Sequence, residues 1–472
     1  MRLDAAKVFL IALWVACLYR AVTQSIVHDE ALTWELYLAG PASAMFTSFD
    51  ANHHFLNTLL MRASTGVFGL SELSMRLPAL CGAALYFAAV YRVARRISPR
   101  WPLVLLAVAA LTLNPFVLDF MVAARGYGMA LALWMWSFAV LLPGSGDGHW
   151  KKRDLLEAGI AVSLSVMANL TFVLPAAMLA GCVVVWWHGA KNREQPSRRP
   201  RKAVASAPSV WLWFALPIGV CALAFWLAAP LDVARAGDFY AGSDSLAESL
   251  RNLVSVSMLY APWIARLPGA AFLRDAIAFV IEPGIVIAAL VLGFRRGDRF
   301  VLIPAVTAAG SAALIAAAHL FGGMPWPLDR TGLYFEVLVV LALIAIAARI
   351  SAPVWSAVAV LALVFAVQFN TRSFYVWRYD ADSRAMANQI AERRTSSAPE
   401  SVQVAGSWQL EPALNFYRVK NGWTWMQPME RRPLAPGAAF YALISSDAGA
   451  ISTLNLHPVY KGPRSGSVLA VP

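Results

Sequence analysis

The residues in this sequence that are best suited to chemistry follow its first long apolar run. Three of the seven histidines fall within 27 residues of one another there. The polar cluster consists of His28, Asp29, Glu30, Asp50, Asn52, His53 and His54. Ionisable groups near membrane depth are costly to bury and usually have a role. A carboxylate in such a cluster can deprotonate a hydroxyl, and imidazoles can orient that carboxylate, bind a phosphate or ligate a divalent metal.

The spacing just before this cluster connects it to the bilayer. Arg20, Gln24 and His28 are four residues apart and share one face if the first helix continues through them. Asp29 and Glu30 would then end that helix, where the helix dipole opposes acidic side chains, so a purely structural role is disfavoured. The polar residues around the two later histidines could equally serve only to order their own loop.

Two arginines further along the chain each stand just before a later apolar run. Arg125 lies in MVAARGYGMAL and Arg330 in PWPLDRTGLYF. Cations fixed at the outer membrane surface suit a lipid-linked phosphate, and Arg20 is a third candidate for that contact. The alternative for each is an interfacial anchor that reaches toward lipid headgroups, and Asp329 could simply pair with Arg330.

Long apolar segments must position these residues. The 472 residues are 59% hydrophobic and only 14% charged, with a mean hydropathy of +0.59, which excludes disorder and indicates a polytopic membrane protein. We expect about eleven transmembrane helices, at residues 8–27, 75–95, 101–119, 126–142, 155–174, 175–189, 210–229, 277–294, 300–320, 331–349 and 353–370. Residues 231–276 are predicted to form a long mobile loop, because they exceed an ordinary connection.

The net charge of +12 reports orientation rather than nucleic acid binding. With the N-terminus in the cytoplasm, 19 of the 39 basic residues fall in cytoplasmic segments and eight in the longer outer loops. The protein is therefore expected in the cytoplasmic (inner) membrane, with its C-terminus outside. On the same rule residues 55–69 lie on the outer face as an interfacial or re-entrant helix. Residues 190–208 are expected to be a solvated cytoplasmic linker.

The chain changes character after Asn370, which divides it into a membrane module, residues 1–370 with an outer catalytic loop at 28–74, and a tail, residues 371–472. The tail is expected to fold as a small extracytoplasmic α/β domain. Asp382 should cap a helix running to about Arg394. Residues 411–419 read as helix, and residues 401–406, 440–445 and 467–471 as strands. Aromatic residues such as Trp408 could stack on sugars, or fill the core or rest at the membrane.

Four stretches resemble the membrane-embedded GT-C glycosyltransferases. The chain is most similar to the branch of dolichyl-phosphate-mannose protein mannosyltransferases, the aminoarabinose transferase of lipid A and RgtA/B/C/D-like enzymes. HDEALTW resembles the acidic motif that ends the first span, and FDANHHFLNTLLMRASTGVFGLSELSMRLPALCGAALYFAAVYRVARR the block that begins HPPLYY. AARGYGMALAL resembles the ARPYG block, and the outer tail fits many bacterial members. Where the family has HPP, this chain has Asn52-His53-His54-Phe55, so either histidine can match.

The resemblance implies a function. The donor would be a polyprenyl-phosphate-linked sugar, and the acceptor a hydroxyl of a glycan, lipid or protein on the outer face. Asp29 would match the general base, Glu30 its acidic partner and Asp50 the second acidic position, with inversion at the sugar. No cofactor is certain, and a divalent metal stays open. The alternatives are a membrane transporter, or a non-catalytic protein that binds glycans or lipids. Transporter folds, however, often show internal symmetry, which this sequence lacks.

Overall fold

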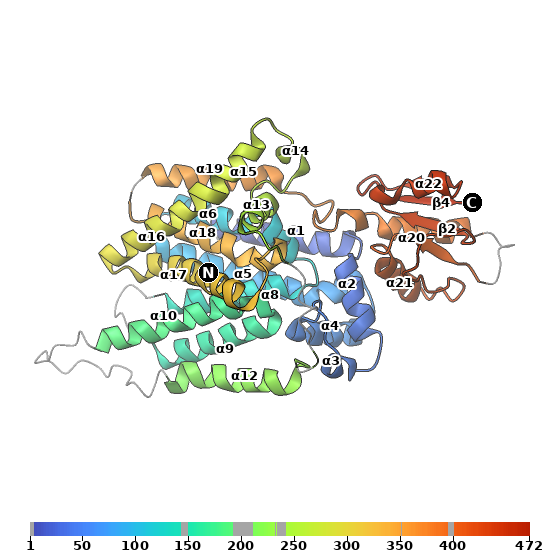
Figure 1. Ribbon diagram of the computed structural model, residues 1–472. Coiled ribbons are helices and arrows are strands. Elements are labelled where there is room, and N and C mark those ends of the chain that lie inside the picture. Colours follow the sequence, from blue (N-terminus) through green and yellow to red (C-terminus); the bar gives the residue numbers. More distant parts are fainter. Residues whose placement is uncertain are drawn as a thin grey trace, which may run out of the picture.

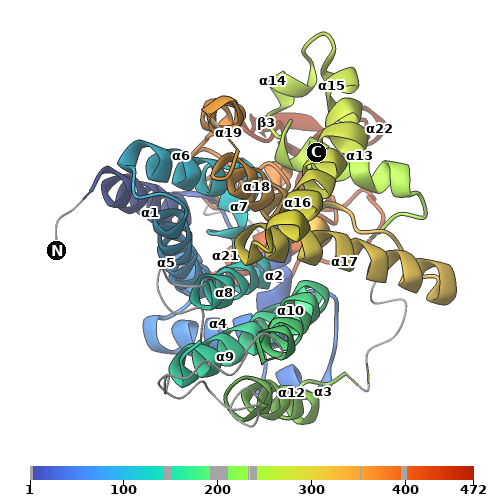
Figure 2. The ribbon, with the colours of Figure 1, turned by 90° about the vertical axis from the view of Figure 1, so that its left-hand side faces the viewer.

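The protein is a helical membrane protein with a small sheet near its C-terminus. The computed structural model describes residues 4–142, 150–191, 211–231, 233, 242–350, 352–394 and 401–472. The expected linker at residues 190–208 falls almost entirely outside this range. Figure 1 shows the sheet and its helices at one end of the helical bundle, beside α2. Seen from the opposite end, α2 lies behind the centre of the bundle in projection (Figure 2).

The membrane module consists mainly of apolar helices. Five are long and apolar enough to cross a membrane: Ala5–Thr23 (α1), Glu72–Ile97 (α5), Ala270–Arg296 (α15 to α16), Arg299–Gly322 (α17) and Asp329–Ala347, which contains α18 (Leu333–Ala347). Shorter apolar helices are α6 (Trp101–Thr112), α8 (Gly126–Leu141), α10 (Val173–Lys191), α12 (Leu216–Ala228) and α19 (Ala352–Gln368). With α9 (Lys152–Ala168), these helices cover every predicted span, and the predicted fold class is confirmed.

Several predicted spans are interrupted. The span at residues 101–119 breaks between α6 and the short helix α7 (Pro115–Phe120). Asn114 causes the break, because its side chain accepts hydrogen bonds from the backbone N–H groups of Phe116 and Val117 and so caps the new helix.

The expectation of one long loop at residues 231–276 is wrong, since its described part contains α13 (Leu246–Ser257), α14 (Pro262–Ala265) and α15 (Ala270–Ala276).

The first helix ends earlier than the spacing suggested. α1 stops at Thr23, and Gln24 has an extended backbone, so Arg20, Gln24 and His28 do not share one helical face. A new short helix, α2 (His28–Thr33), begins after four residues. The prediction that Asp29 and Glu30 end a helix is therefore wrong. They lie in the first turn of α2, where the helix dipole favours negative charge.

The helices after α2 build the rest of the polar loop. A π-helical turn (Trp34–Leu38) continues α2, and α3 (Ala44–Thr47) and α4 (Phe55–Phe68) follow. α4 is the helix expected at residues 55–69. The Arg62 side chain fastens the loop by donating to the carbonyl oxygens of Tyr37 and Gly40, each at 2.9 Å.

The C-terminal domain is built on a four-stranded mixed sheet. The strands are β1 (Val404–Gly406), β2 (Phe440–Leu443), β3 (His457–Lys461) and β4 (Val468–Val471), in the order β1-β2-β4-β3. β1 and β2 are parallel, whereas β2–β4 and β4–β3 are antiparallel. The helices α20 (Ser383–Arg393) and α21 (Glu411–Lys420) agree with prediction, and β3 was missed.

The predicted cap of α20 differs in detail. Asp382 precedes the helix but does not cap it with its side chain. One Asp382 carboxylate oxygen instead accepts the backbone N–H groups of Arg464 and Ser465 and the Ser465 hydroxyl. The Asp382 carboxylate thus stabilises the turn between β3 and β4.

The C-terminal domain shares a hydrophobic core with the loop helices. Met386 and Ile390 of α20 and Leu414 of α21 pack in one cluster with Ala31 and Met61 of the membrane module. This shared core fixes the domain against α2 and α4.

A polar contact adds to that attachment. Glu72, at the start of α5, is bound by the Tyr417 hydroxyl at 2.9 Å, by Lys420 Nζ at 2.5 Å and by Arg384 at 2.8 Å.

The first residues after the last membrane helix also belong to the helical module, because Phe374 and Trp377 pack in its main core.

Gly126 marks a point where two helices meet too closely for a side chain. A Cβ at this position would lie 1.9 Å from the Ala168 carbonyl oxygen and 2.8 Å from the His54 Cβ. We expect Gly126→Ala to lower the free energy of unfolding by about 1–3 kcal/mol, because backbone must move to admit the methyl group. Gly66→Ala is the control, since nothing lies within 4 Å of its Cβ position. Thermal unfolding of the two purified variants measures the difference, and equal midpoints would contradict the predicted clash.

Candidate active site

Asp29 lies in a buried site where several segments of the chain meet. Its side chain is 10% exposed. The preceding residue, His28, is tied to the C-terminal domain, because its backbone N–H donates to Asp380 Oδ2 at 2.6 Å. The imidazole Nδ1 of His28 lies 2.8 Å from the carbonyl oxygen of Gln409. The chain before the candidate base is therefore held by two contacts that are distant in sequence.

Arg125 and Arg330 converge on this carboxylate. The guanidinium Nη2 atoms of Arg125 and Arg330 lie 3.6 Å and 3.5 Å from Asp29 Oδ2. Oδ2 has no hydrogen-bond partner among the described residues, so these are ion pairs at a distance rather than closed bidentate contacts. Arg125 is 1% exposed, while the side chain of Arg330 is 23% exposed. The structure thus groups one predicted base with two predicted phosphate ligands.

The two arginines set the charge of Asp29. Burial raises the pKa of the Asp29 carboxyl, but the charges of Arg125 and Arg330 outweigh burial and hold it below its ordinary value of 3.8. Asp29 is consequently ionised throughout the neutral range. An anion bound by the same arginines would withdraw part of this stabilisation and make the carboxylate a stronger base.

His54 stands beside the two arginines. Its Nδ1 lies 3.2 Å from Asn169 Nδ2, and the amide orientation follows from Asn169 Oδ1 accepting from Thr171. Nδ1 is then the acceptor, which places the ring proton on Nε2. Burial, followed by the charges of Arg125 and Arg330, lowers the His54 pKa well below 6.5, so the ring is neutral. The buried Nε2 has no partner among the described residues and is free to donate.

The other residues of the histidine segment make local contacts. The His53 ring stacks on Tyr37 with centroids 4.2 Å apart, and burial lowers the His53 pKa to about 4. Asp50 accepts from the backbone and side-chain amides of Asn52, at 2.8 and 2.9 Å. No three metal-ligating side chains gather within the described part of the chain. The described residues thus add no support to the divalent metal that the sequence left open.

Glu30, the predicted acidic partner of the base, is held by four contacts within the protein. Its two carboxylate oxygens receive Arg76 Nε at 2.9 Å and Nη2 at 2.6 Å, and both side chains are fully buried. Glu30 also accepts the backbone N–H groups of Val27 and Ala124. All its acceptor positions are therefore committed to holding α2 against α5 and the segment before α8. Glu30 positions the site and has no capacity left to take a proton from a substrate.

Arg20 is also committed elsewhere. It is 2% exposed and forms an ion pair with Asp119 of α7, and its guanidinium also contacts the Ser373 carbonyl oxygen. Asp119 in turn accepts from the Tyr260 hydroxyl and from the backbone N–H of Tyr375. This network joins α1, α7 and the chain after α19. It does not include Asp29, so these contacts give no support to the predicted binding of a phosphate by Arg20.

Sequence reasoning missed the residues that the C-terminal segment brings to the site. The side chain of Trp377 lies within hydrogen-bonding reach of Asp29. Burial, assisted by the charges of Asp29 and Glu30, raises the pKa of Asp380 well above 3.8.

Tyr127 was also missed. It interacts with Arg330 and packs edge-on against His54, with ring centroids 5.1 Å apart. Tyr127 sits two residues after Arg125 in the ARGYG motif, which is the one signal that could have found it.

Comparison with known proteins supports the fold. No family model matches the chain, and no curated protein sequence matches it significantly. Among solved structures, ArnT from Cupriavidus metallidurans in the apo state is similar over 98% of this chain and 97% of its own, with 15% identity and a TM-score of 0.50. The crystal structure of ArnT bound to undecaprenyl phosphate matches with 14% identity and a TM-score of 0.49, over the same shares of both chains.

A larger protein also resembles the chain. The arabinofuranosyltransferase AftD from Mycobacteria matches 100% of this chain but 40% of its own length, with 14% identity and a TM-score of 0.46. ArnT and AftD are GT-C membrane glycosyltransferases. The chain has the GT-C fold, on the likeness to apo ArnT, and at these identities the likeness describes the fold alone.

The Glu30–Arg76 pair allows a sharp test of how the site is held. Glu30→Gln leaves a buried guanidinium without its counter-charge, so we expect a loss of about 3–5 kcal/mol in the free energy of unfolding. The double variant Glu30→Gln/Arg76→Met removes both charges and should lose less stability than the two single variants lose together. Chemical unfolding of the wild type, both single variants and the double variant measures the coupling. Additive losses would show that the pair contributes no mutual stabilisation.

Proposed function

We propose that this protein is a membrane glycosyltransferase that moves a sugar from a polyprenyl phosphate to a hydroxyl acceptor on the outer face of the membrane. The single observation that carries the proposal is the grouping of the Asp29 carboxylate with Arg125 and Arg330 in one buried site. The GT-C fold and the resemblance of the HDEALTW and ARGYG motifs support it. The C-terminal domain is then extracytoplasmic.

In this proposal Asp29 acts as the general base. Its carboxylate removes the proton of the acceptor hydroxyl, whose oxygen attacks the anomeric carbon in a single displacement with inversion. The bond between that carbon and the phosphate oxygen breaks, and the polyprenyl phosphate leaves with the bonding electrons. Phosphate is a reasonable leaving group, so positioning and charge stabilisation are the main tasks of the site.

The two arginines and His54 stabilise the leaving phosphate. Arg125 and Arg330 supply two positive charges, and Nε2 of the neutral His54 supplies a further donor. Before the donor binds, both cations are directed at Asp29. A phosphate that takes up the arginines therefore releases the base at the moment it is needed.

Replacing the base should stop turnover. We expect Asp29→Asn to lower the transfer rate by about 10²–10⁴-fold, because the amide cannot accept the hydroxyl proton. Transfer of a radiolabelled sugar from its polyprenyl phosphate to an envelope extract measures this effect, with membrane insertion checked in parallel. Asp275→Asn is the control, since Asp275 pairs with Arg251 and Arg274 away from the site. Wild-type turnover by Asp29→Asn would remove the base assignment.

The competition between carboxylate and phosphate predicts a gain in binding. We expect Asp29→Asn to bind undecaprenyl phosphate about tenfold more tightly than wild type, because the carboxylate no longer repels the phosphate or occupies the arginines. Arg330→Gln should weaken binding by about 10–100-fold through loss of a charge-assisted contact.

Thermophoresis with labelled protein measures both dissociation constants without an acceptor. Arg266→Gln is the matched control, because Arg266 is an exposed arginine at the end of α14. If Asp29→Asn binds undecaprenyl phosphate more weakly than wild type, the phosphate does not share its arginines with the carboxylate.

A further inference from the structure

A second set of buried carboxylates lies in a cavity that the proposed reaction does not use. The cavity has a volume of about 290 Å³ and lies between α13, α16 (Glu282–Arg296), α17 and α18. Aliphatic and aromatic side chains form most of its wall, among them Leu250, Ile287, Ile315 and Phe335. The lining includes two acids, Glu282 and Glu336, and no lysine, arginine or histidine.

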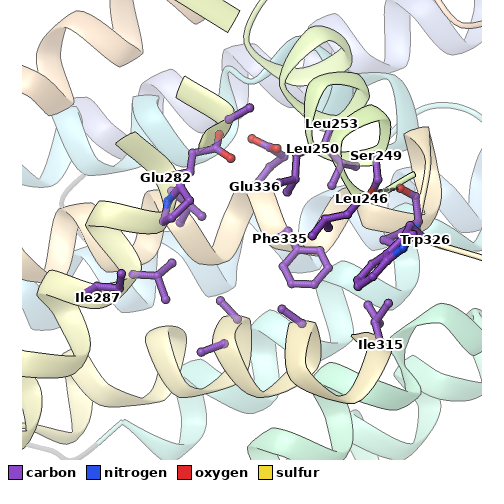
Figure 3. A pocket seen from close by; sticks show the side chains of 18 of the residues that line it. Leu246, Ser249, Leu250, Leu253, Glu282, Ile287, Ile315, Trp326, Phe335 and Glu336 are labelled. Atoms are coloured by element: carbon purple, nitrogen blue, oxygen red, sulfur yellow. Dashed lines mark hydrogen bonds between the residues drawn. The ribbon is translucent and has the colours of Figure 1, made fainter. Parts of the chain in front are cut away.

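The two glutamates meet at one end of this cavity. Figure 3 shows their carboxylates directed toward one another, with Trp326 and Ile315 on the far side of the space. Glu336 is 2% exposed, and its Oε2 has no hydrogen-bond partner among the described residues. Oε1 of Glu282 is likewise buried without a partner in this part of the chain. The third polar side chain of the wall, Ser249, already donates to the Pro327 carbonyl oxygen at 2.6 Å.

The backbone around the two acids has two notable features. Glu336 lies in the first turn of α18, where the helix dipole stabilises a carboxylate. Glu282 follows directly on a π-helical turn, Ile277–Ile281, an irregularity that is frequent at functional sites. Both acids also lie in membrane-spanning segments, where an uncompensated carboxylate is expensive.

The side chains that line the cavity favour one class of ligand. A purely apolar chain would leave both carboxylate oxygens unsatisfied, and water would not neutralise two neighbouring acids. Ca²⁺ takes six to eight oxygen ligands, more than two carboxylates provide. A primary ammonium group carries one charge and three N–H donors, enough for both unpaired oxygens. An attached hydrocarbon chain would fill the apolar remainder.

Access to the cavity also fits an amphiphile. Ile287 lines the cavity and is 60% exposed on a helix that is apolar enough to span the membrane. A ligand can therefore enter from the bilayer with its chain in apolar surroundings. We propose that this cavity is a binding site for a long-chain primary amine, whose ammonium group is held between Glu282 and Glu336. The proposal is independent of the transferase reaction.

Dodecylamine is the probe for this site. With the full chain in phosphatidylcholine nanodiscs at pH 7, we expect a saturable rise of roughly 1–3 °C in the thermal midpoint. Dodecanol has the same chain without the charge and should produce no comparable rise. Native mass spectrometry should detect one bound amine per chain. No rise with dodecylamine, or an equal rise with dodecanol, would overturn the proposal.

Variants locate the effect. Glu336→Gln and Glu282→Gln should each abolish the rise with dodecylamine, whatever their own stability, because each removes one of the two carboxylates. Glu248→Gln should retain it, since Glu248 is an exposed acid on α13 that bonds Ser243 outside the cavity. A rise that persists in either cavity variant, or a glutamate-dependent rise with Ca²⁺ alone and none with the amine, contradicts an amine site held between the two glutamates.

Discussion

The buried contact between Arg76 and the end of the first helix is the constraint on which the site depends. The Arg76 guanidinium binds both oxygens of Glu30 and also donates to the carbonyl oxygens of Ala21, Gln24 and Ser25. The carbonyl oxygens of Ala21 and Ser25 would otherwise be unsatisfied where α1 stops, whereas that of Gln24 also accepts from Arg384. One side chain thus permits the first helix to end inside the protein and a new helix to begin at His28. Without that break, Asp29 would continue the face of α1 instead of opening α2.

Asp29 and Glu30 differ in how far nearby arginines compensate their negative charge. Glu30 is matched by a single arginine at hydrogen-bonding distance, so its charge is fully compensated and fixed. Asp29 faces two arginines at 3.5 and 3.6 Å, which leaves net positive charge around it. A site with excess positive charge attracts an anion, while a closed pair does not. Two adjacent acids in the sequence therefore have separate tasks, one in holding the fold and one in the proposed chemistry.

The helices and strands that depend only on neighbouring residues could be predicted from the sequence. Long apolar runs predicted the membrane helices, and short apolar segments, one of them with alternation, predicted three of the four strands in the C-terminal sheet. The residue types around Asp29, Arg125 and Arg330 were also identified, although their convergence joins positions about 300 residues apart. The break at residues 24–27 was missed because it depends on Arg76, which lies some fifty residues later. Trp377 and Asp380 were missed because only the docking of the C-terminal segment brings them to α2.

The attachment of the C-terminal domain has a consequence for how the site works. The same domain that shares its core with α2 and α4 also holds His28 through Asp380 and the Gln409 carbonyl oxygen. Movement of the domain would therefore displace the residue next to Asp29, while Glu30 stays fixed by Arg76. Trp408, which is 53% exposed and lies edge-on to His28 at 5.3 Å, faces solvent at this junction. In the proposed reaction, an acceptor that approaches from solvent at this junction would meet the residues that hold His28, next to Asp29.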